Sequence, residues 1–145
     1  MIINSVLLDM EVAQAFAFVT GRISEWWPPE RRHTGDNNSC IFLLASGRFY
    51  ERASDGREVE LGKVTLWNEP HVILLDFYIA TGPDHPTEVE MRFEASGTQT
   101  RVTVNHRPKP ESAHLWDERS PRYATSWSIV LASLARHASS AVERP

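Results

Sequence analysis

Cysteine is almost absent from this chain of 145 residues, because Cys40 is the only one. A disulfide needs two cysteines, so no internal disulfide can form, which is typical of proteins from a reducing compartment. The six histidines contain no pair at the short spacing that metal sites use. The sequence also lacks the phosphate-loop, dinucleotide and G-x-S-x-G signatures. We therefore expect no metal site and no cofactor.

The sequence also has no basic stripe and no long apolar run. Its net charge is −4, with 15 Lys and Arg against 19 Asp and Glu, and the basic residues are scattered among acidic ones. Proteins that bind nucleic acid concentrate positive charge, so we expect no nucleic-acid partner. No apolar stretch approaches the roughly 18 residues of a membrane span, and Asp9 and Glu11 interrupt the apolar start. We expect a cytoplasmic protein with no signal peptide and no membrane span.

What the chain does contain is aromatic residues: five Trp, six Phe and three Tyr. Its length predicts a single domain over residues 1–145, and such a domain buries roughly two-thirds of its unfolded surface. The apolar share of 41% and the charged share of 23% are ordinary for a globular protein. The tryptophans therefore indicate either a large core or the wall of a cavity.

Alternation of apolar and polar residues predicts strands from residue 39 to residue 107. We expect a first strand at 2–9 and further strands near 40–45, 47–53, 57–67, 71–79, 87–95 and 98–106. The alternation is clearest where Val89, Met91 and Phe93 face inward and the charged residues between them face water. Short connections such as Ser46-Gly47, and one wet face, are typical of an antiparallel sheet.

Helical spacing of apolar residues appears before and after this region. Between the first strand and residue 30 it involves Val12, Phe16, Val19 and Ile23. Gly21 should break this stretch into two short helices, and Pro28 should end it. Near the C-terminus, Ser120-Pro121 is a good helix start, and the helix should run to about residue 137. Residues 111–118 should form a separate short helical turn.

This order of elements predicts an α+β fold. A curved antiparallel sheet of about seven strands would wrap around the long C-terminal helix, with two short helices after the first strand. The apolar face of such a sheet must be covered, and the C-terminal helix is the only long amphipathic element in the sequence. A strongly bent sheet that grips one helix leaves space between them, and large aromatic side chains would line that space.

Several short motifs follow one another in an order that is characteristic of a known superfamily. They are Trp26-Trp27-Pro28, the stretch 47–52, Asp55-Gly56, Gly62-Lys63-Val64, the stretches 67–70, 87–93 and 100–106, and Tyr123 with Trp127 and Leu131. Together they cover nearly the whole chain. The sequence resembles the START-like helix-grip superfamily, also called SRPBCC, and within it the bacterial homologues of the activator of heat-shock protein 90 ATPase. Ser126 departs from the glycine that often stands before the helix tryptophan in that family.

The resemblance implies a START/Bet v-like helix-grip fold with an internal cavity. We expect the cavity candidates to be Trp26, Trp27, Phe49, Glu51, Trp67, Met91, Phe93, His106, Trp116, Tyr123, Trp127 and Leu131. Of the Trp26-Trp27 pair, one side chain should lie in the core and the other at the cavity rim.

Three polar residues in the predicted sheet have two interpretations each. His106 should face inward, where it would either contact a ligand, as hydrogen-bond partner or acid–base group, or be satisfied by backbone at the cavity rim. Glu51 should face inward if Phe49 does, as a polar anchor or base with a raised pKa; otherwise it forms an ion pair with an arginine on a neighbouring strand, or a different register leaves it in water. Asp76 should be exposed if its neighbours Leu75 and Phe77 face inward.

Three functions remain compatible with the sequence. The first is binding of a hydrophobic or amphipathic small molecule in the cavity. The second is a protein-interaction module that contacts a heat-shock chaperone, as the resemblance implies, and a homodimer through a sheet edge is a further option. The third is a cyclase or hydrolase type of enzyme with His106 or Glu51 as general base. The sequence offers no strong catalytic constellation, so we rank the third function below binding.

Overall fold

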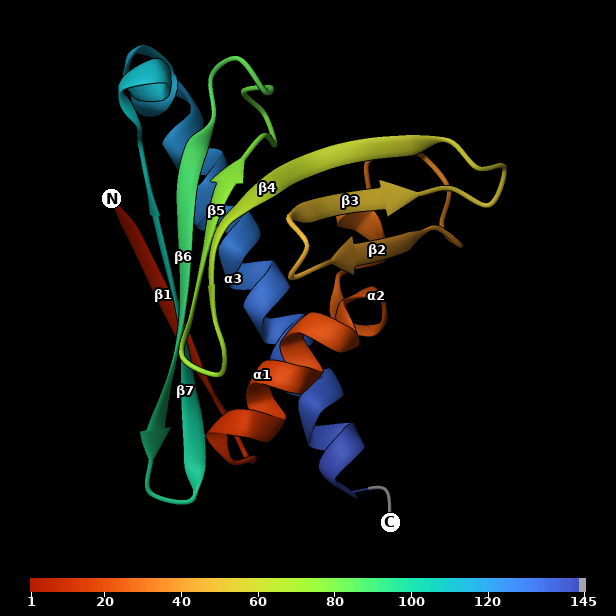
Figure 1. Cartoon of the computed structure of the whole chain (residues 1–145), viewed down its shortest axis with the longest axis vertical. Coiled ribbons are helices and arrows are strands. Elements are labelled where there is room, and N and C mark those ends of the chain that lie inside the picture. The colour runs from red at the N-terminus through yellow and green to blue at the C-terminus, as the bar shows by residue number, and fades with distance from the viewer. Residues whose placement is uncertain (144–145) are drawn as a thin grey trace.

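Six of the strands follow one another along the chain and pair in sequence, and the first strand closes the row beside the last (Figure 1). The computed structural model describes residues 1–143. The strands are β1 (Ile2–Leu8), β2 (Cys40–Leu43), β3 (Arg48–Arg52), β4 (Glu58–Asn68), β5 (Val72–Phe77), β6 (Thr87–Ser96) and β7 (Gln99–Arg107). They form one antiparallel sheet in the order β1-β7-β6-β5-β4-β3-β2.

The helices are α1 (Val12–Gly21), α2 (Ile23–Trp26) and α3 (Ala113–Glu143), with two 3₁₀ turns, η1 (Pro29–Arg31) and η2 (Pro110–Ser112). The sheet curls around α3, which runs along its concave side, and α1 and α2 lie beside the second half of α3 (Figure 1). This arrangement confirms the predicted helix-grip fold.

The predicted inward faces of β6 and β7 are confirmed. Val89, Met91 and Phe93 are at most 6% exposed, and Val104 and His106 are fully buried. Charged side chains between them lie on the other face, where Arg107 donates to Glu88 over 2.6 Å. The sheet therefore has one apolar face that α1, α2 and α3 cover.

The sheet bends where β4 crosses from β5 to β3 (Figure 1). Gly62 stands at this point and pairs with both Phe49 and Phe77. A Cβ atom added to Gly62 would lie 2.4 Å from the carbonyl oxygen of Asp76, so this close approach of two strands requires glycine. The bend brings the rings of Phe49 and Phe77 to a centroid distance of 6.4 Å on the concave side.

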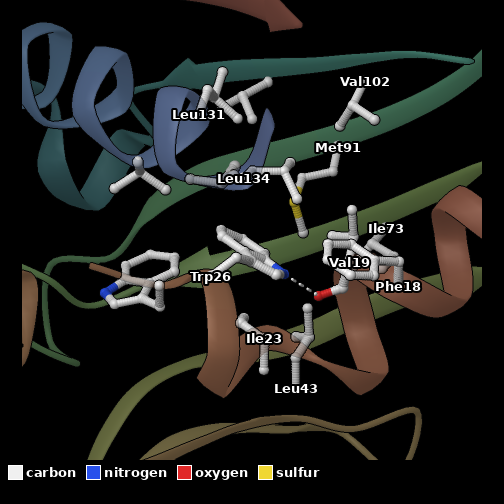
Figure 2. Close-up of a cluster of buried hydrophobic side chains, with 14 of the residues drawn as sticks. Phe18, Val19, Ile23, Trp26, Leu43, Ile73, Met91, Val102, Leu131 and Leu134 are labelled. Carbon is white, nitrogen blue, oxygen red and sulfur yellow. Dashed lines mark hydrogen bonds between the residues drawn. The ribbon is translucent and has the colours of Figure 1, made fainter. Parts of the chain in front are cut away.

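The two short helices end as predicted, at Gly21 and before Pro28. Trp26 fills the space between α2, α3 and the sheet, and its indole N–H donates to the carbonyl of Val19 over 3.1 Å (Figure 2). The hydroxyl of Ser133 on α3 donates to the carbonyl of Trp26 over 2.6 Å. These bonds fix α1, α2 and α3 to one another around a dense apolar cluster.

The predicted start of the C-terminal helix is wrong. Ser120-Pro121 does not begin a helix, because α3 starts at Ala113 and runs through Pro121 to Glu143, and residues 113–118 belong to it. A proline inside a helix removes one backbone hydrogen bond and costs about 3 kcal/mol. Packing offsets that cost on the N-terminal side of Pro121, where the ring of Trp116 lies 5.4 Å from the ring of His106.

Asp76 also differs from its prediction. Its neighbours Leu75 and Phe77 do face inward, but the Asp76 side chain is only 20% exposed and accepts a hydrogen bond from Nζ of Lys109 over 2.7 Å. The segment after β7 carries Lys109 across the sheet face, a tertiary contact that alternation along β5 does not reveal.

Candidate functional site

A cavity of about 530 Å³ lies between the first half of α3, the end of β5 and the segment that follows α2. It is partly open to solvent, and its lining is mostly apolar. The lining residues are Trp27, Arg31, His33, Phe77, Ile79, Ala80, Pro121, Arg122, Tyr123, Thr125, Ser126, Trp127 and Val130. A volume of this size is within the range of small-molecule sites in proteins, roughly 300–1,000 Å³.

Four aromatic rings form the inner wall of this cavity and pack on one another. The centroid of Trp127 lies 6.3 Å from that of Trp27 and 5.8 Å from that of Phe77. The ring of Tyr123 lies 6.2 Å from Phe77. All four side chains are at most 5% exposed. Rings that hold one another in place form a rigid apolar wall, which suits a ligand with flat apolar surface.

Hydrogen bonds from α3 hold the segment after β5 against the cavity. The Tyr123 hydroxyl donates to the carbonyl of Ile79 over 2.6 Å, and Nε of Arg119 donates to the carbonyl of Ala80 over 3.0 Å. Ala80 has a φ of 69°, a conformation that is unusual for a residue with a side chain. Burial raises the pKa of Tyr123, so its hydroxyl stays neutral and remains a donor near pH 7.

His106 lies behind this wall and is fully buried. Its Nδ1 accepts the indole N–H of Trp127 over 2.9 Å, and its Nε2 lies 2.7 Å from Oγ1 of Thr87. An indole N–H can only donate, so Nδ1 must be unprotonated and Nε2 must carry the proton that it donates to Thr87. Burial lowers the pKa of His106 to about 3. The imidazole is therefore neutral, and both of its nitrogens are occupied, Nδ1 by Trp127 and Nε2 by Thr87.

Glu51 is also fully buried, and no arginine pairs with it among the described residues. Its carboxylate accepts the backbone N–H groups of His33 and Thr34 over 2.7 and 2.9 Å, and the hydroxyl of Thr34 over 2.5 Å. Burial by itself raises its pKa, but the hydrogen bonds from Thr34, His33 and Ser39 outweigh burial, and the pKa lies below its ordinary value. Glu51 thus anchors the segment that carries His33 into the cavity wall.

Replacing Glu51 by glutamine should lower the free energy of unfolding by about 2–3 kcal/mol, because a neutral amide loses charge-assisted bonds and its NH₂ group faces the donors of residues 33 and 34. Urea unfolding at pH 7 measures the loss, and hydrogen exchange at the amides of His33 and Thr34 should become faster. Glu94→Gln, at an exposed position of β6, is the matched control. Equal free energies of unfolding for the Glu51 and Glu94 variants would show that the hydrogen bonds of Glu51 do not stabilise the protein.

The sequence-predicted residues divide into three groups in the structure. Trp27, Tyr123 and Trp127 line the cavity. Trp26, Phe49, Met91 and Leu131 surround a second void of only about 10 Å³, too small to hold more than one water, and thus belong to the filled core. Glu51, Trp67, Phe93, His106 and Trp116 line neither space. The rings of Trp67 and Phe93 instead pack on Phe16, at 5.2 and 5.0 Å.

Most of the polar lining was not predicted from the sequence. Arg31 and His33 lie in the polar stretch 30–38, where the sequence predicts only a loop. Arg122 follows Pro121, which was predicted to begin a helix. The sequence left open which face of β5 is inward, because the run is apolar on both faces, so Phe77 was only one of two alternatives there. No pattern along the chain places Arg31 beside α3, because that contact depends on how the segment after α2 folds back.

Other possible sites are weaker. Among residues 1–143, no group of three or more His, Cys, Asp or Glu side chains is placed to hold a metal ion. No helix in this part of the chain is long and apolar enough to cross a membrane. A hollow of about 510 Å³ between α1 and the end of α3 is more open and more polar than the aromatic cavity.

No protein-family model and no curated protein matches the sequence. Solved structures, however, show the same fold. The self-sacrificing resistance protein CalC from Micromonospora echinospora is 21% identical with a TM-score of 0.73, and the match covers 99% of this chain and 97% of CalC. The anthrahydroquino-gamma-pyrone synthase Txn09, complexed with SUM, is 24% identical with a TM-score of 0.58, covering 93% and 94% of the two chains.

The Aha1 dimer from Colwellia psychrerythraea is 17% identical with a TM-score of 0.57, and the match covers 92% of each chain. These likenesses confirm the helix-grip fold that the sequence motifs indicated. They include a resistance protein, a synthase and an Aha1 protein, so the fold by itself does not select one function.

Proposed function

We propose that this protein binds an apolar or amphipathic small molecule in the cavity between α3 and the end of β5. The observation that carries the proposal is the aromatic wall, in which Trp27, Phe77, Tyr123 and Trp127 are fixed around about 530 Å³ of space next to a core that is otherwise filled. A rigid, mostly apolar wall beside an open space of this size is the usual form of a small-molecule site, because a ligand can remove that apolar surface from water.

The affinity would come from apolar surface that ligand and wall remove from water. A ligand that buries about 200 Å² of apolar surface gains about 5 kcal/mol at roughly 25 cal/mol per Å², before the costs of association. Tyr123 cannot add a free donor, since its hydroxyl is committed to Ile79. His106 is committed to Trp127 and Thr87, so neither of these two residues supports acid–base chemistry in the cavity. The geometry therefore favours binding over an enzymatic reaction.

Binding can be tested with N-phenyl-1-naphthylamine, a neutral aromatic probe whose fluorescence rises in an apolar site. We expect saturable binding, and the variant Ser126→Trp should weaken it at least about tenfold because an indole would occupy the cavity. Ser128→Trp, at an exposed position of α3 outside the lining, is the matched control. Circular dichroism must show that both variants fold. Equal probe affinity in wild type and the Ser126 variant would contradict the proposal.

A further inference from the structure

The cavity lining is positively charged, although the whole protein has a net negative charge. The chain carries a net charge of −4, yet the cavity lining contains two arginines and a histidine. Among the described residues, no aspartate or glutamate lines it. The buried carboxylate of Glu51 contacts the lining residue His33, but donors from His33 and Thr34 already satisfy it. The cavity is therefore an apolar space with unbalanced positive charge at its wall.

Arg31 is a lining residue whose side chain has no hydrogen-bond partner among the described residues. Its backbone is held in η1: its amide N–H donates to the carbonyl of Pro28 over 3.0 Å, and its carbonyl accepts the indole N–H of Trp27 over 3.2 Å. Its side chain is partly buried, and Nε is fully buried without an acceptor among the described residues. A buried donor without an acceptor is costly, so it demands an explanation.

The neighbouring arginine, Arg32, has a structural role in the same segment. Nε of Arg32 is likewise buried without an acceptor among the described residues, but its two terminal nitrogens donate to the carbonyls of Ser39, Ser24 and Trp27 over 2.5, 2.7 and 3.2 Å. That side chain braces the segment after α2. The terminal guanidinium nitrogens of Arg31 make no such bonds within the part of the chain that the structure describes, so bracing does not account for this side chain.

Two further arginines, Arg119 and Arg122, lie on α3 near the cavity and differ in their contacts. Arg119 is tied to the carbonyl of Ala80 and to Glu118, whereas Arg122 lies exposed in the cavity lining. Arg122 thus adds positive charge at the solvent side of the same space that Arg31 enters from η1. A guanidinium with a fixed backbone and free N–H groups is suited to bind a carboxylate or similar planar anion with two parallel hydrogen bonds.

We propose that the cavity takes a planar aromatic anion, such as an aromatic carboxylate or enolate, whose ring packs on the aromatic wall and whose negative group binds Arg31. This inference rests on the proposed function, since it names the class of ligand for the same cavity. Arg122 contributes at longer range, and screening by salt weakens its effect more than that of the partly buried Arg31.

The test uses two ligands with the same ring and nearly the same shape, 2-naphthoate and 2-naphthamide, measured by displacement of N-phenyl-1-naphthylamine and by calorimetry at pH 7.5. We expect naphthoate to bind the wild type about tenfold more tightly than naphthamide. Arg31→Gln should reduce this preference to within about threefold and leave naphthamide affinity unchanged. Arg31→Lys should recover part of the preference, because it keeps the charge and loses the paired geometry.

Arg101→Gln is the matched control, because Arg101 is exposed on β7 outside the cavity lining, and its side chain bonds Ser5 and no other residue among those that the structure describes. This control should keep the full preference for naphthoate. Naphthoate and naphthamide binding equally well, or both weakening equally in Arg31→Gln, would overturn the anion inference and leave the proposed function standing. If none of the three aromatic compounds binds, both the inference and the proposed function are overturned.

Discussion

Lowering the pH from 7 to 4.5 should reduce the free energy of unfolding by about 2–3 kcal/mol through His106 alone. In the unfolded chain His106 takes up a proton near its ordinary pKa of 6.5, whereas burial holds its pKa in the folded protein at about 3. The unfolded state therefore binds more protons throughout this window, and stability is lost as the pH falls, at about 1.4 kcal/mol per pH unit below 6. Above pH 7 His106 should contribute no pH dependence.

The physical reason is the surroundings of His106. Uncharged groups pack against it, namely Thr87, Phe77, Trp116, Tyr123 and Trp127. A proton on Nδ1 would break the bond from the Trp127 indole, because two donors would then face each other. Protonation of His106 is thus coupled to the position of a tryptophan in the cavity wall.

Urea unfolding at intervals between pH 7 and 4.5 measures this dependence, and the variant His106→Gln should show a slope smaller by about one proton. The pKa of His33 is also lowered, by partial desolvation that the Glu51 carboxylate opposes, so His33→Gln measures the share of that residue. Glu51 and Asp36, whose pKa values in the folded protein lie below their ordinary range, begin to reduce stability only below about pH 5, at the acid end of this window. The assignment fails if the slope of His106→Gln equals that of the wild type.

Replacing Trp26 by alanine should destabilise the protein by about 3–5 kcal/mol. The side chain is 2% exposed and lies at the centre of the cluster in Figure 2, where Leu134 and Met91 surround it. Its loss would leave a cavity in the filled part of the core and remove the hydrogen bond to the carbonyl of Val19. Urea unfolding at pH 7 gives the magnitude, and Trp26→Phe should lie between the wild type and the alanine variant.

Trp67→Ala is the matched control for this experiment. Trp67 is only partly buried, and its main ring contact is an edge-on one with Phe16 at 5.2 Å. Its removal exposes a surface hollow that water can fill, so the loss of stability should be clearly smaller. A larger loss for Trp67→Ala than for Trp26→Ala would show that the centre of the core lies elsewhere.

The positions of Trp26 and Trp27 were predictable from the sequence only in part. The pair was expected to divide between core and cavity rim, and in the structure Trp26 packs in the filled cluster while Trp27 lines the aromatic cavity. Adjacent residues at a helix end point in different directions, so a division is predictable. Which of the two meets empty space depends on the curvature of the sheet, which is set where Gly62 lets β4 and β5 approach.

Glu51 and Pro121 show where local patterns fail. Alternation with Phe49 placed Glu51 inward, as observed, but its partners are two backbone N–H groups and one hydroxyl of a segment 17 and 18 residues away. Backbone donors carry no sequence signature. Pro121 follows a residue that suits a helix cap, and local propensity favours a start there. The contacts of Trp116 with His106 on β7 instead continue α3 through it.

By itself the sequence determined the order of the elements, the inward faces of β6 and β7 and the break between α1 and α2, because periodicity and glycine or proline act over a few neighbouring residues. Only the tertiary structure decided which aromatic side chains fill the core and which surround a cavity. An unfilled volume is the small difference between the space that a bent sheet encloses and the side chains that enter it from distant segments. The same long-range folding placed Arg31 at the aromatic wall, and with it the charge on which the proposed ligand class depends.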